Sequence, residues 1–375
     1  MDGIGWTNGC GSGIVKWMEM EARPDGAPNI SGLRISAKVL KLIGSIDEFK
    51  GAWRAIGRIA PDRLSALRRI ATIESAASST RIEGAKLTDR EVARLLSNLD
   101  IQSFSSRDEQ EVAGYAQVME IVFAHWNEIA LTENYIRQLH RDLLQHSTKD
   151  ERHRGSYKTL PNDVAAFDID GRKVGTVFAT ATPFDTPRLM AELIAWTNHA
   201  FKTQAQHPLV IIAVFIVSLL EIHPFQDGNG RLSRILTTLL LLKNGYAYVP
   251  YASLESVVES TKERYYIALR QTQGTTKTVN PDWTSWLEYF VGTLFEQKSR
   301  LEKKIEREQL LLGDLPDLSV KILELCKERG RVTISDVEKV TGANRNTIKD
   351  HVAALTRNRH LTRHGAGRGA WYALT

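Results

Sequence analysis

The stretch 223–234, HPFQDGNGRLSR, carries a histidine, a carboxylate, two glycines and two arginines within 12 positions of the chain. The ordinary pKa of a histidine is close to neutrality, so His223 can accept a proton from an attacking hydroxyl group. Gly228 and Gly230 allow backbone N–H groups to point at one anion, and a helix that begins beside them adds the positive end of its dipole. These features favour the binding of phosphate next to a base.

The charged side chains of the same stretch suit a nucleotide. Arg231 and Arg234 are three positions apart on the expected helix, so both guanidinium groups can reach the same face and neutralise phosphate charge. Asp227 offers a carboxylate, and Mg²⁺ is typically held by one or two carboxylates together with phosphate oxygens. Asp227 is therefore the expected protein ligand of Mg²⁺, and the whole stretch indicates phosphoryl or nucleotidyl transfer.

Each of these features has an ordinary structural explanation when it occurs alone. A histidine after an apolar helix is usually a structural residue, and Gly-Asn-Gly is usually a turn. Their coincidence in one short stretch favours a catalytic loop over either explanation.

Two apolar segments must position this loop. Residues 209–222 and 232–243 have the composition of buried helices, and Gly245 ends the second of them. The apolar run 209–220 is shorter than the roughly 20 residues that cross a bilayer, so we expect a core helix and no membrane partner. Apolar residues at helical spacing predict further helices at 63–79 and 106–128, and from about residue 185.

A β-hairpin is expected between these helices. The runs 163–169 (DVAAFDI) and 173–178 (KVGTVF) flank Asp170-Gly171. An Asp-Gly pair between two such runs is a strong hairpin signal, because both turn positions need a positive φ. The predicted fold of this part of the chain is therefore mainly α, with one β-hairpin.

The stretch HPFQDGNGRLSR resembles the full signature of the Fic family, and the likeness extends over residues 63–289. The resemblance implies a helical Fic bundle in which ATP lies along the loop and gives up its α-phosphate. The hairpin resembles the family's flap, which aligns an extended target segment by strand addition. Family members that transfer phosphate usually depart from the signature around the glycines, so these positions favour AMP transfer. By the same resemblance His223 is the general base and Asp227 binds Mg²⁺, while the residues that hold ATP are Gly228, Asn229, Gly230, Arg231 and Arg234.

A second stretch, SSTRIEG at 78–84, is similar to the inhibitory motif of the same family. The pattern is a hydroxyl residue followed four positions later by Glu and then Gly, here Ser79, Glu83 and Gly84. Because it precedes the Fic core, it resembles the class II type, in which an N-terminal helix inhibits its own domain. The implied mechanism is that the carboxylate pairs with Arg234 and displaces the γ-phosphate of ATP. A plain helix end is the alternative for so short a pattern.

The expected function is that of a protein adenylyltransferase, which transfers AMP from ATP to a Ser, Thr or Tyr hydroxyl group of a target protein and is inhibited by Glu83. Two alternatives stay open. The chain could be a DNA-binding transcriptional regulator whose Fic domain senses a nucleotide, although a sensor needs no base such as His223. It could also be bifunctional, with Glu83 positioning a water molecule that removes AMP from a modified target.

Residues 317–375 are expected to form a winged helix-turn-helix domain. The stretch 316–375 has 11 Lys and Arg against 6 Asp and Glu, and 11 − 6 = +5 is the net charge of the whole chain. The predicted order is a helix at 320–329, a short helix capped by Ser335, a turn at Gly342, a helix at 344–358 and two strands. Docking of a protein is an equal alternative to binding DNA. The residues expected to contact DNA are Arg345, Lys349, Arg357 and Arg359, one of Asn344 and Asn346, and His364 and Arg368 at the tip.

The bulk composition sets the class of protein. The 375 residues include 42% hydrophobic and 25% charged ones, which is typical of a globular protein with two or three domains. Cys10 and Cys326 are far apart, and the N-terminus lacks the pattern of a signal peptide, so we expect a cytoplasmic protein without disulfides. A homodimer stays open. The predicted organisation is an N-terminal segment at 1–60 with a poorly ordered start, a Fic domain at 61–290 with the inhibitory helix at 61–84 and the flap at 157–180, a helical linker at 291–316 and the winged helix at 317–375.

Overall fold

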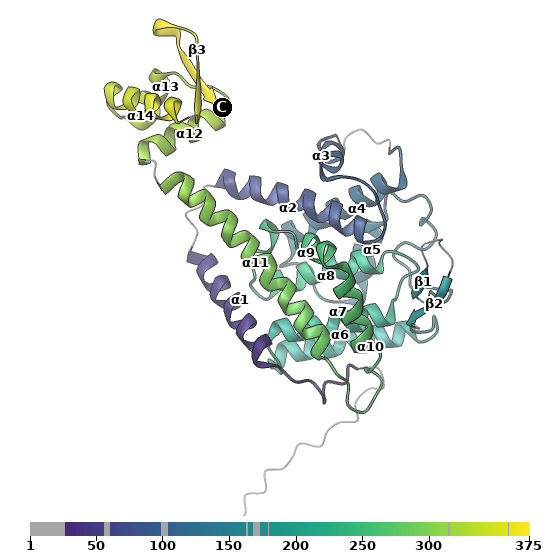
Figure 1. Ribbon diagram of the computed structural model, residues 1–375. Helices are drawn as coiled ribbons and strands as arrows, with labels where there is room; N and C mark the ends of the chain where they lie inside the picture. The colour runs from purple at the N-terminus through teal and green to yellow at the C-terminus, as the bar shows by residue number, and fades with distance from the viewer. Residues whose placement is uncertain are drawn as a thin grey trace, which may run out of the picture. The chain divides into compact units, whose positions relative to one another are not determined.

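The protein is mainly helical, as the sequence predicts. The computed structural model describes residues 27–55, 61–98, 104–162, 164–167, 173–178, 180–313, 316–358 and 360–375. The chain divides into two compact units, Met1–Lys298 and Ser299–Thr375 (Figure 1). The prediction of a poorly ordered start and the predicted Asp170-Gly171 turn lie outside the described residues.

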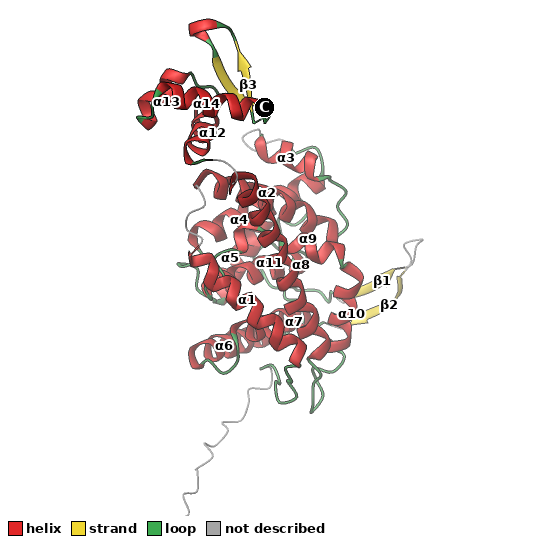
Figure 2. Cartoon of the chain, turned by 60° about the vertical axis from the view of Figure 1, so that its left-hand side comes forward, coloured by secondary structure: helices red, strands yellow, loops and turns green. Residues whose placement is uncertain are grey.

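The first unit is a helical bundle that surrounds two buried helices. Nearly every residue of α7 (Pro208–Ile222) and α8 (Asn229–Lys243) is buried, and Figures 1 and 2 both show this pair inside the other helices. The helix α7 is apolar on all sides and so has no face for water, whereas the buried polar side chains of α8 include Arg231 and Arg234, which are paired with neighbouring helices. The remaining helices of the unit are α1 (Ala37–Ala55), α2 (Pro61–Ile82), α3 (Asp89–Ser97), α4 (Arg107–His125), α5 (Glu133–Leu143), α6 (Thr186–Thr203), α9 (Leu254–Ser260) and α10 (Lys262–Gln273), with the short 3₁₀ turn η1 (Val249–Tyr251). The long helix α11 (Thr284–Gly313) begins in this unit and ends in the second.

No helix in the described part of the chain combines the length and the apolar character that crossing a membrane requires.

Two helix ends differ from the expected ones, and both lie at the predicted site. The helix α8 begins at Asn229, with Gly228 before it at φ 80°, three residues earlier than the apolar segment 232–243 from which it was expected. The helix α2 ends at Ile82, so Glu83 lies on the turn beyond it. Gly84 has a φ of 109°, and Ala85 donates its N–H to the carbonyl of Thr80 at 3.1 Å. Such a C-terminal turn needs a residue that tolerates positive φ, which is why glycine follows the glutamate.

The predicted hairpin is present. Strand β1 (Val164–Phe167) pairs antiparallel with β2 (Lys173–Phe178), and the register shifts twice along the pair. The hairpin follows the segment 156–162 and leads into α6. Lys158, before the hairpin, donates to the carbonyl of Ile222 at the end of α7 and to the hydroxyl oxygen of Thr180, after the hairpin. Both ends of the hairpin therefore lie near the loop between α7 and α8.

The second unit ends in three helices and a hairpin, in the order that the sequence predicts. These are α12 (Asp317–Arg329), α13 (Ile334–Thr341), α14 (Arg345–Arg357), β3 (Leu361–His364) and β4 (Trp371–Leu374), with the turn η2 (Gly367–Gly369) between the strands. One detail of the prediction is wrong: Thr333 caps α13 through a reciprocal pair of bonds with Asp336, and Ser335 lies inside the helix. The small core of the unit includes Ile322, Cys326, Val337, Ile348, Val352 and Leu355.

The division between the two units falls inside α11 and does not coincide with the expected domain boundary at 316–317. The expected linker at 291–316 is helical up to Gly313 and continuous with residues 284–290. The helix α11 continues unbroken across residues 298 and 299, so its sequence pattern could not show where one unit ends and the next begins.

Candidate active site

His223 lies at the end of α7 in the left-handed conformation, with φ 52° and ψ 62°. Its backbone N–H donates to the carbonyl of Leu219 at 2.9 Å, and its Nδ1 lies 3.1 Å from the carbonyl oxygen of Leu220. A carbonyl oxygen only accepts hydrogen bonds, so Nδ1 carries the hydrogen and Nε2 carries the lone pair. Burial lowers the pKa of His223. The ring is therefore neutral at pH 7 and can accept a proton at Nε2.

Asn229 holds the loop closed. Its Oδ1 accepts the backbone N–H of Phe225 at 2.9 Å, and its Nδ2 donates to the carbonyl of Phe225 at 2.7 Å. The side chain is 3% exposed. The sequence predicts that Asn229 holds phosphate, whereas the structure places both ends of its amide on the backbone of the loop. An anion here would meet the N–H groups of the first turn of α8, which have no partner within the helix.

Two residues that sequence analysis missed support the same loop. Lys158 is buried, and its Nζ donates to Oδ1 of Asn162 at 2.7 Å and to the carbonyl of Ile222 at 3.0 Å. Asn162 donates in turn to the carbonyls of His223, at 3.2 Å, and Phe225, at 2.6 Å. The segment before the hairpin therefore fixes the backbone on both sides of His223. A lysine and an asparagine outside any motif gave no signal of this role.

His140 supports the loop from the other side. Gly155 donates its N–H to Nδ1 of His140 at 2.9 Å, so Nε2 carries the hydrogen and donates to the carbonyl of Asp227, also at 2.9 Å. The ring stacks on Phe225 with 3.8 Å between the centroids. Burial lowers the pKa of His140 to about 4. This histidine is therefore a neutral structural residue, and only its place on the buried face of α5 could have indicated it.

Asp227 lies in a cluster of charges between α4 and α8. Its Oδ1 accepts the N–H of Gly228 at 2.6 Å and Nη2 of Arg231 at 3.3 Å, and its Oδ2 accepts Nη2 of Arg107 at 2.9 Å. Glu111 bonds to Nε of Arg107 at 2.7 Å and lies 3.1 Å from Nη1 of Arg231. Burial alone would raise the pKa of Asp227, but Arg231, the N–H of Gly228 and Arg107 together hold it below its ordinary value. Asp227 is therefore ionised, as a metal ligand must be.

Arg234 connects the stretch 223–234 to the stretch 78–84. Its Nε donates to Oγ of Ser79 at 2.9 Å, and its Nη2 donates to the carbonyl of Ser79 at 3.0 Å and to Oε1 of Glu83 at 2.8 Å. The side chain of Arg234 is 5% exposed and that of Glu83 is 34% exposed. Oε1 of Glu83 would lie 2.2 Å from a Cβ at Gly230. The carboxylate therefore lies against the first turn of α8, where phosphate is expected.

The two arginines of the stretch do not share one face, contrary to expectation. Arg231 points to Glu111 on α4, and Arg234 points to Ser79 on α2. Nη1 of Arg234 is buried and has no hydrogen-bond acceptor among the described residues. An unsatisfied guanidinium N–H beside the start of a helix suits an anion.

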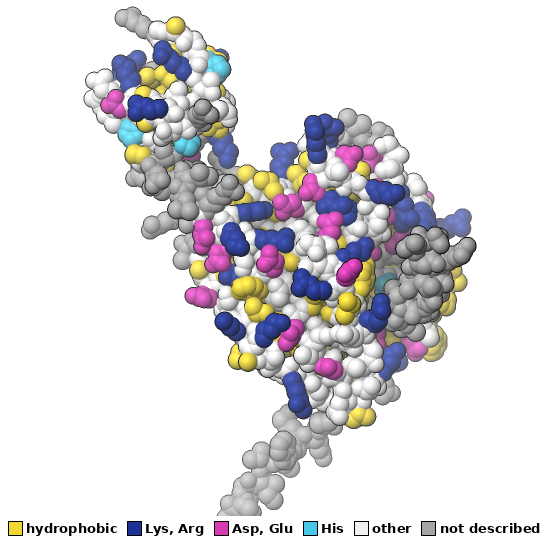
Figure 3. All heavy atoms as spheres, viewed as in Figure 1, with side chains coloured by type: hydrophobic (Ala, Val, Ile, Leu, Met, Phe, Trp, Pro, Cys, Tyr) yellow, Lys and Arg dark blue, Asp and Glu magenta, His cyan; other side chains and the backbone are white. Residues whose placement is uncertain are grey.

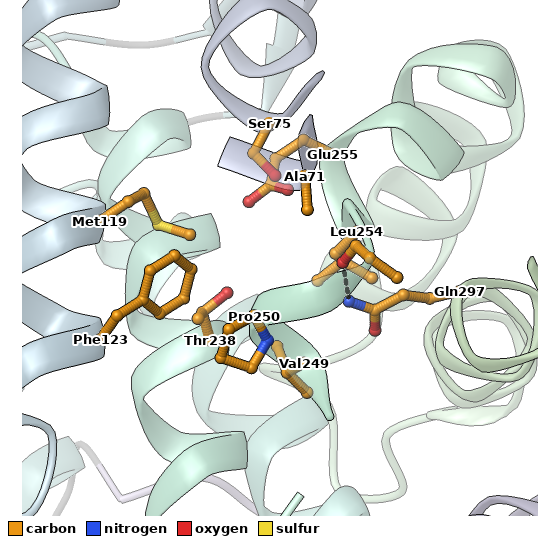
Figure 4. Close-up of a pocket in the computed structure, with 11 residues that line it drawn as sticks. Ala71, Ser75, Met119, Phe123, Thr238, Val249, Pro250, Leu254, Glu255 and Gln297 are labelled. Atoms are coloured by element: carbon orange, nitrogen blue, oxygen red, sulfur yellow. Dashed lines mark hydrogen bonds between the residues drawn. The ribbon is translucent and has the colours of Figure 1, made fainter. Parts of the chain in front are cut away.

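A small cavity lies one helical turn away from the contact between Ser79 and Arg234. Figure 4 shows it between Ser75 of α2, Thr238 of α8 and Glu255 of α9. Its volume of about 10 Å³ is that of one water molecule, far below the several hundred Å³ of a nucleotide pocket. None of residues 223–234 lines this cavity, so it is separate from the predicted catalytic loop.

Part of the first unit is similar to a known protein family. Residues 130–241 match the model of the Fic/DOC family, and residues 314–369 match a model described as a bacterial protein of unknown function, DUF977. The protein adenylyltransferase Fic of Drosophila mojavensis is 27% identical over 237 residues, which cover 60% of this chain and 44% of that protein. The protein of the same name from Drosophila grimshawi is 28% identical over 204 residues, covering 54% and 39%. The chain thus spans less than half the length of these curated relatives.

Solved structures support the fold. A Fic family protein from Desulfovibrio desulfuricans G20 matches with a TM-score of 0.62 and 22% identity, over 92% of this chain and 98% of that one. A Fic domain containing signaling protein from Bacteroides thetaiotaomicron matches with a TM-score of 0.53 and 25% identity, over 70% and 95%. The helical bundle with its hairpin is therefore a Fic fold.

Proposed function

We propose that the chain is a protein adenylyltransferase that transfers AMP from ATP to a Ser, Thr or Tyr hydroxyl group of a target protein, and that Glu83 inhibits it. The observation that carries the proposal is the bond between Arg234 and Glu83 at 2.8 Å, beside a loop whose histidine is neutral. The names of the relatives support a nucleotidyl transfer of this type. The resemblance around the glycines favours AMP over phosphate as the transferred group.

The chemistry follows from the positions of the side chains. Nε2 of His223 takes the proton of the target hydroxyl group as its oxygen forms a bond to the α-phosphorus of ATP. The bond between that phosphorus and the bridging oxygen to the β-phosphate breaks, and pyrophosphate leaves. The N–H groups at the start of α8 and the guanidinium of Arg234 hold phosphate oxygens while negative charge moves to the leaving group.

The residues present fit Mg²⁺ only together with a nucleotide. No group of three or more candidate ligands occurs in the described ranges, but Asp227 supplies one ionised carboxylate, and phosphate oxygens would complete the shell. Bound Mg²⁺ neutralises charge that develops on the phosphates. Arg107 must move away from Oδ2 of Asp227 before that oxygen can bind the metal.

Inhibition follows from competition for one cation. Arg234 can hold either the γ-phosphate of ATP or the carboxylate of Glu83, which already lies against Gly230. With Glu83 in place, ATP binds without its proper γ-phosphate contact, and the α-phosphate does not face the incoming hydroxyl group in line with the leaving group. The bifunctional alternative uses the same carboxylate to orient water for AMP removal.

The C-terminal helices and hairpin support a second candidate, a winged helix that binds DNA. Lys349 and Arg357 on α14 are exposed, and basic side chains stand out over this unit in Figure 3. Two other residues that were predicted to contact DNA bond within the protein: Asn344 caps α14 by accepting the N–H of Asn346 at 2.8 Å, and Arg345 pairs with Glu338 at 3.2 Å. His364 stacks on Trp371. Arg359 and the side chain of Arg368 lie outside the described residues.

The activity is tested with ATP labelled either at the α-phosphate or at the γ-phosphate. The Glu83→Gly variant is incubated with Mg²⁺ and a cell lysate, and labelled proteins are identified by mass spectrometry. Transfer of the α-label alone, with AMP found on a hydroxyl side chain, supports adenylyl transfer. Transfer of the γ-label would show a kinase, and ATP binding without any label on protein would support a nucleotide sensor.

A further inference from the structure

We infer that Arg81 is a positioning residue, which holds Glu83 on Arg234 by tying the end of α2 to α9 through Glu259. Nε of Arg81 donates to Oε1 of Glu259 at 2.6 Å, and its Nη2 donates to Oε2 of the same carboxylate at 2.9 Å. The two bonds form a bidentate pair, the strongest geometry open to an arginine and a carboxylate. The inference rests on the proposed inhibition by Glu83.

The same guanidinium also fixes the chain beyond Glu83. Nη1 of Arg81 donates to the carbonyl of Leu87 at 3.0 Å and to Oδ1 of Asp89, the first residue of α3, at 2.9 Å. Glu83 and the Gly84 turn thus lie between two segments that Arg81 holds together. Arg81 therefore restrains the chain on both sides of the turn that carries Glu83.

Glu83 needs such a restraint because a single hydrogen bond joins its side chain to Arg234. Its Oε1 accepts one hydrogen bond from Nη2 of Arg234, and the side chain is about a third exposed, at 34%. The competing γ-phosphate of ATP carries more negative charge and several oxygens. A carboxylate wins this competition when the backbone already presents it to the arginine, because little conformational freedom is then lost on pairing.

The Arg81–Glu259 pair is suited to a restraint that can be released. Its side chains are 24% and 29% exposed, so water reaches the pair, in contrast to the buried guanidinium of Arg234. The hydrogen bonds that Arg81 donates to Glu259 raise the pKa of Arg81, so its guanidinium stays charged over the physiological range. Breaking the pair leaves no fully buried charge behind, so α2 can loosen without unfolding the domain.

The test compares Glu259→Gln, Arg81→Gln, their double variant and Glu83→Gly, each assayed as the full chain for the initial rate of AMP transfer. Glu259→Gln keeps the shape of the side chain and removes its charge. We expect each single variant to raise the rate about 3- to 10-fold, as the loss of a partly exposed charge-assisted pair permits. The double variant should gain no more than Arg81→Gln alone, because that change already removes every bond of the guanidinium, and neither change should add to Glu83→Gly.

Arg68→Gln is the matched control, because Arg68 also ties α2 to a neighbour, Glu120 on α4, but near the other end of the helix. It should leave the rate at the wild-type value. Thermal unfolding checks that every variant is folded, and hydrogen exchange of the amides at 83–87 should become faster in Glu259→Gln. Wild-type rates and exchange in folded Arg81→Gln and Glu259→Gln would overturn the inference, as would an equal gain in Arg68→Gln or a further gain on Glu83→Gly. If Glu83→Gly itself shows no gain, the proposed inhibition fails instead.

Discussion

Nη2 of Arg234 donates to Oε1 of Glu83 at 2.8 Å, across 151 positions of the chain. The arginine belongs to the helix that follows the catalytic loop, and the glutamate belongs to the turn that ends α2. Because Ser79 takes two further bonds of the same guanidinium, the whole C-terminal turn of α2 is bound to it. A single cation thus links the helix that follows the loop to the segment that we propose blocks it.

His223→Ala should abolish AMP transfer and leave ATP binding nearly unchanged. In the proposed mechanism the neutral ring acts on the target hydroxyl group through Nε2 and does not hold the nucleotide. Loss of a positioned base typically costs about 10²–10⁴-fold in rate. Labelling and calorimetric titration with ATP, both in the Glu83→Gly background, measure the two effects. Labelling at the parent rate would remove His223 from the mechanism.

His140 should make the domain sensitive to acid. Its pKa is about 4 in the folded protein, below the ordinary value near 6.5, so the unfolded chain binds the proton first and stability falls as the pH drops through this window. From about pH 7.5 to about pH 5 the loss from this residue is about 2 kcal/mol. Denaturant unfolding of wild type and His140→Gln at both pH values measures it. The variant should lose less stability than wild type over the same range, and an equal loss in both proteins would contradict the assignment.

Arg107→Gln should strengthen the binding of a divalent cation with ATP. Arg107 occupies Oδ2 of Asp227 at 2.9 Å, and removing its charge frees that oxygen and ends the repulsion of the metal. The pair is partly exposed, so we expect a change of about 3- to 10-fold in the metal concentration for half saturation. Electron spin resonance of Mn²⁺ with a non-hydrolysable ATP analogue reports it without catalysis. Arg188→Gln, which changes an exposed pair on α6, should match wild type. Weaker Mn²⁺ binding by Arg107→Gln would instead make this arginine a phosphate ligand.

The basic surface of α14 should bind duplex DNA with a steep dependence on salt. Each phosphate that a lysine or arginine neutralises releases counterions, so Lys349→Gln and Arg357→Gln should each lower the slope of log affinity against log salt by about 1. Fluorescence anisotropy of the full chain with labelled duplexes measures the slopes, and Lys202→Gln on α6 is the control. Absence of binding at low salt would favour a protein-docking role for this unit.

The helices beside the candidate site could be predicted from the sequence, whereas the contacts that support its loop could not. The spacing of 223–234 predicted the loop, and apolar runs predicted α7 and α8, because both signals are local. The support of the loop by Lys158, Asn162 and His140 depends on contacts between segments far apart in the chain. The opposite directions of Arg231 and Arg234 were missed for the same reason, since they follow from Glu111 on α4 and Ser79 on α2. These partners can be identified only from the folded structure.

The most direct test of the account is the rate of AMP transfer by wild type, Glu83→Gly, Arg234→Ala and the double variant, measured side by side with α-labelled ATP. We predict that Glu83→Gly labels protein, itself included, about 10-fold or more faster than wild type, as the loss of a charge-assisted bond of 1.4 kcal/mol or more allows. Arg234→Ala should be inactive alone and in the Glu83→Gly background, because the γ-phosphate then lacks its partner. A Glu83→Gly rate equal to wild type, or an active double variant, would contradict the claim that Glu83 and ATP compete for Arg234.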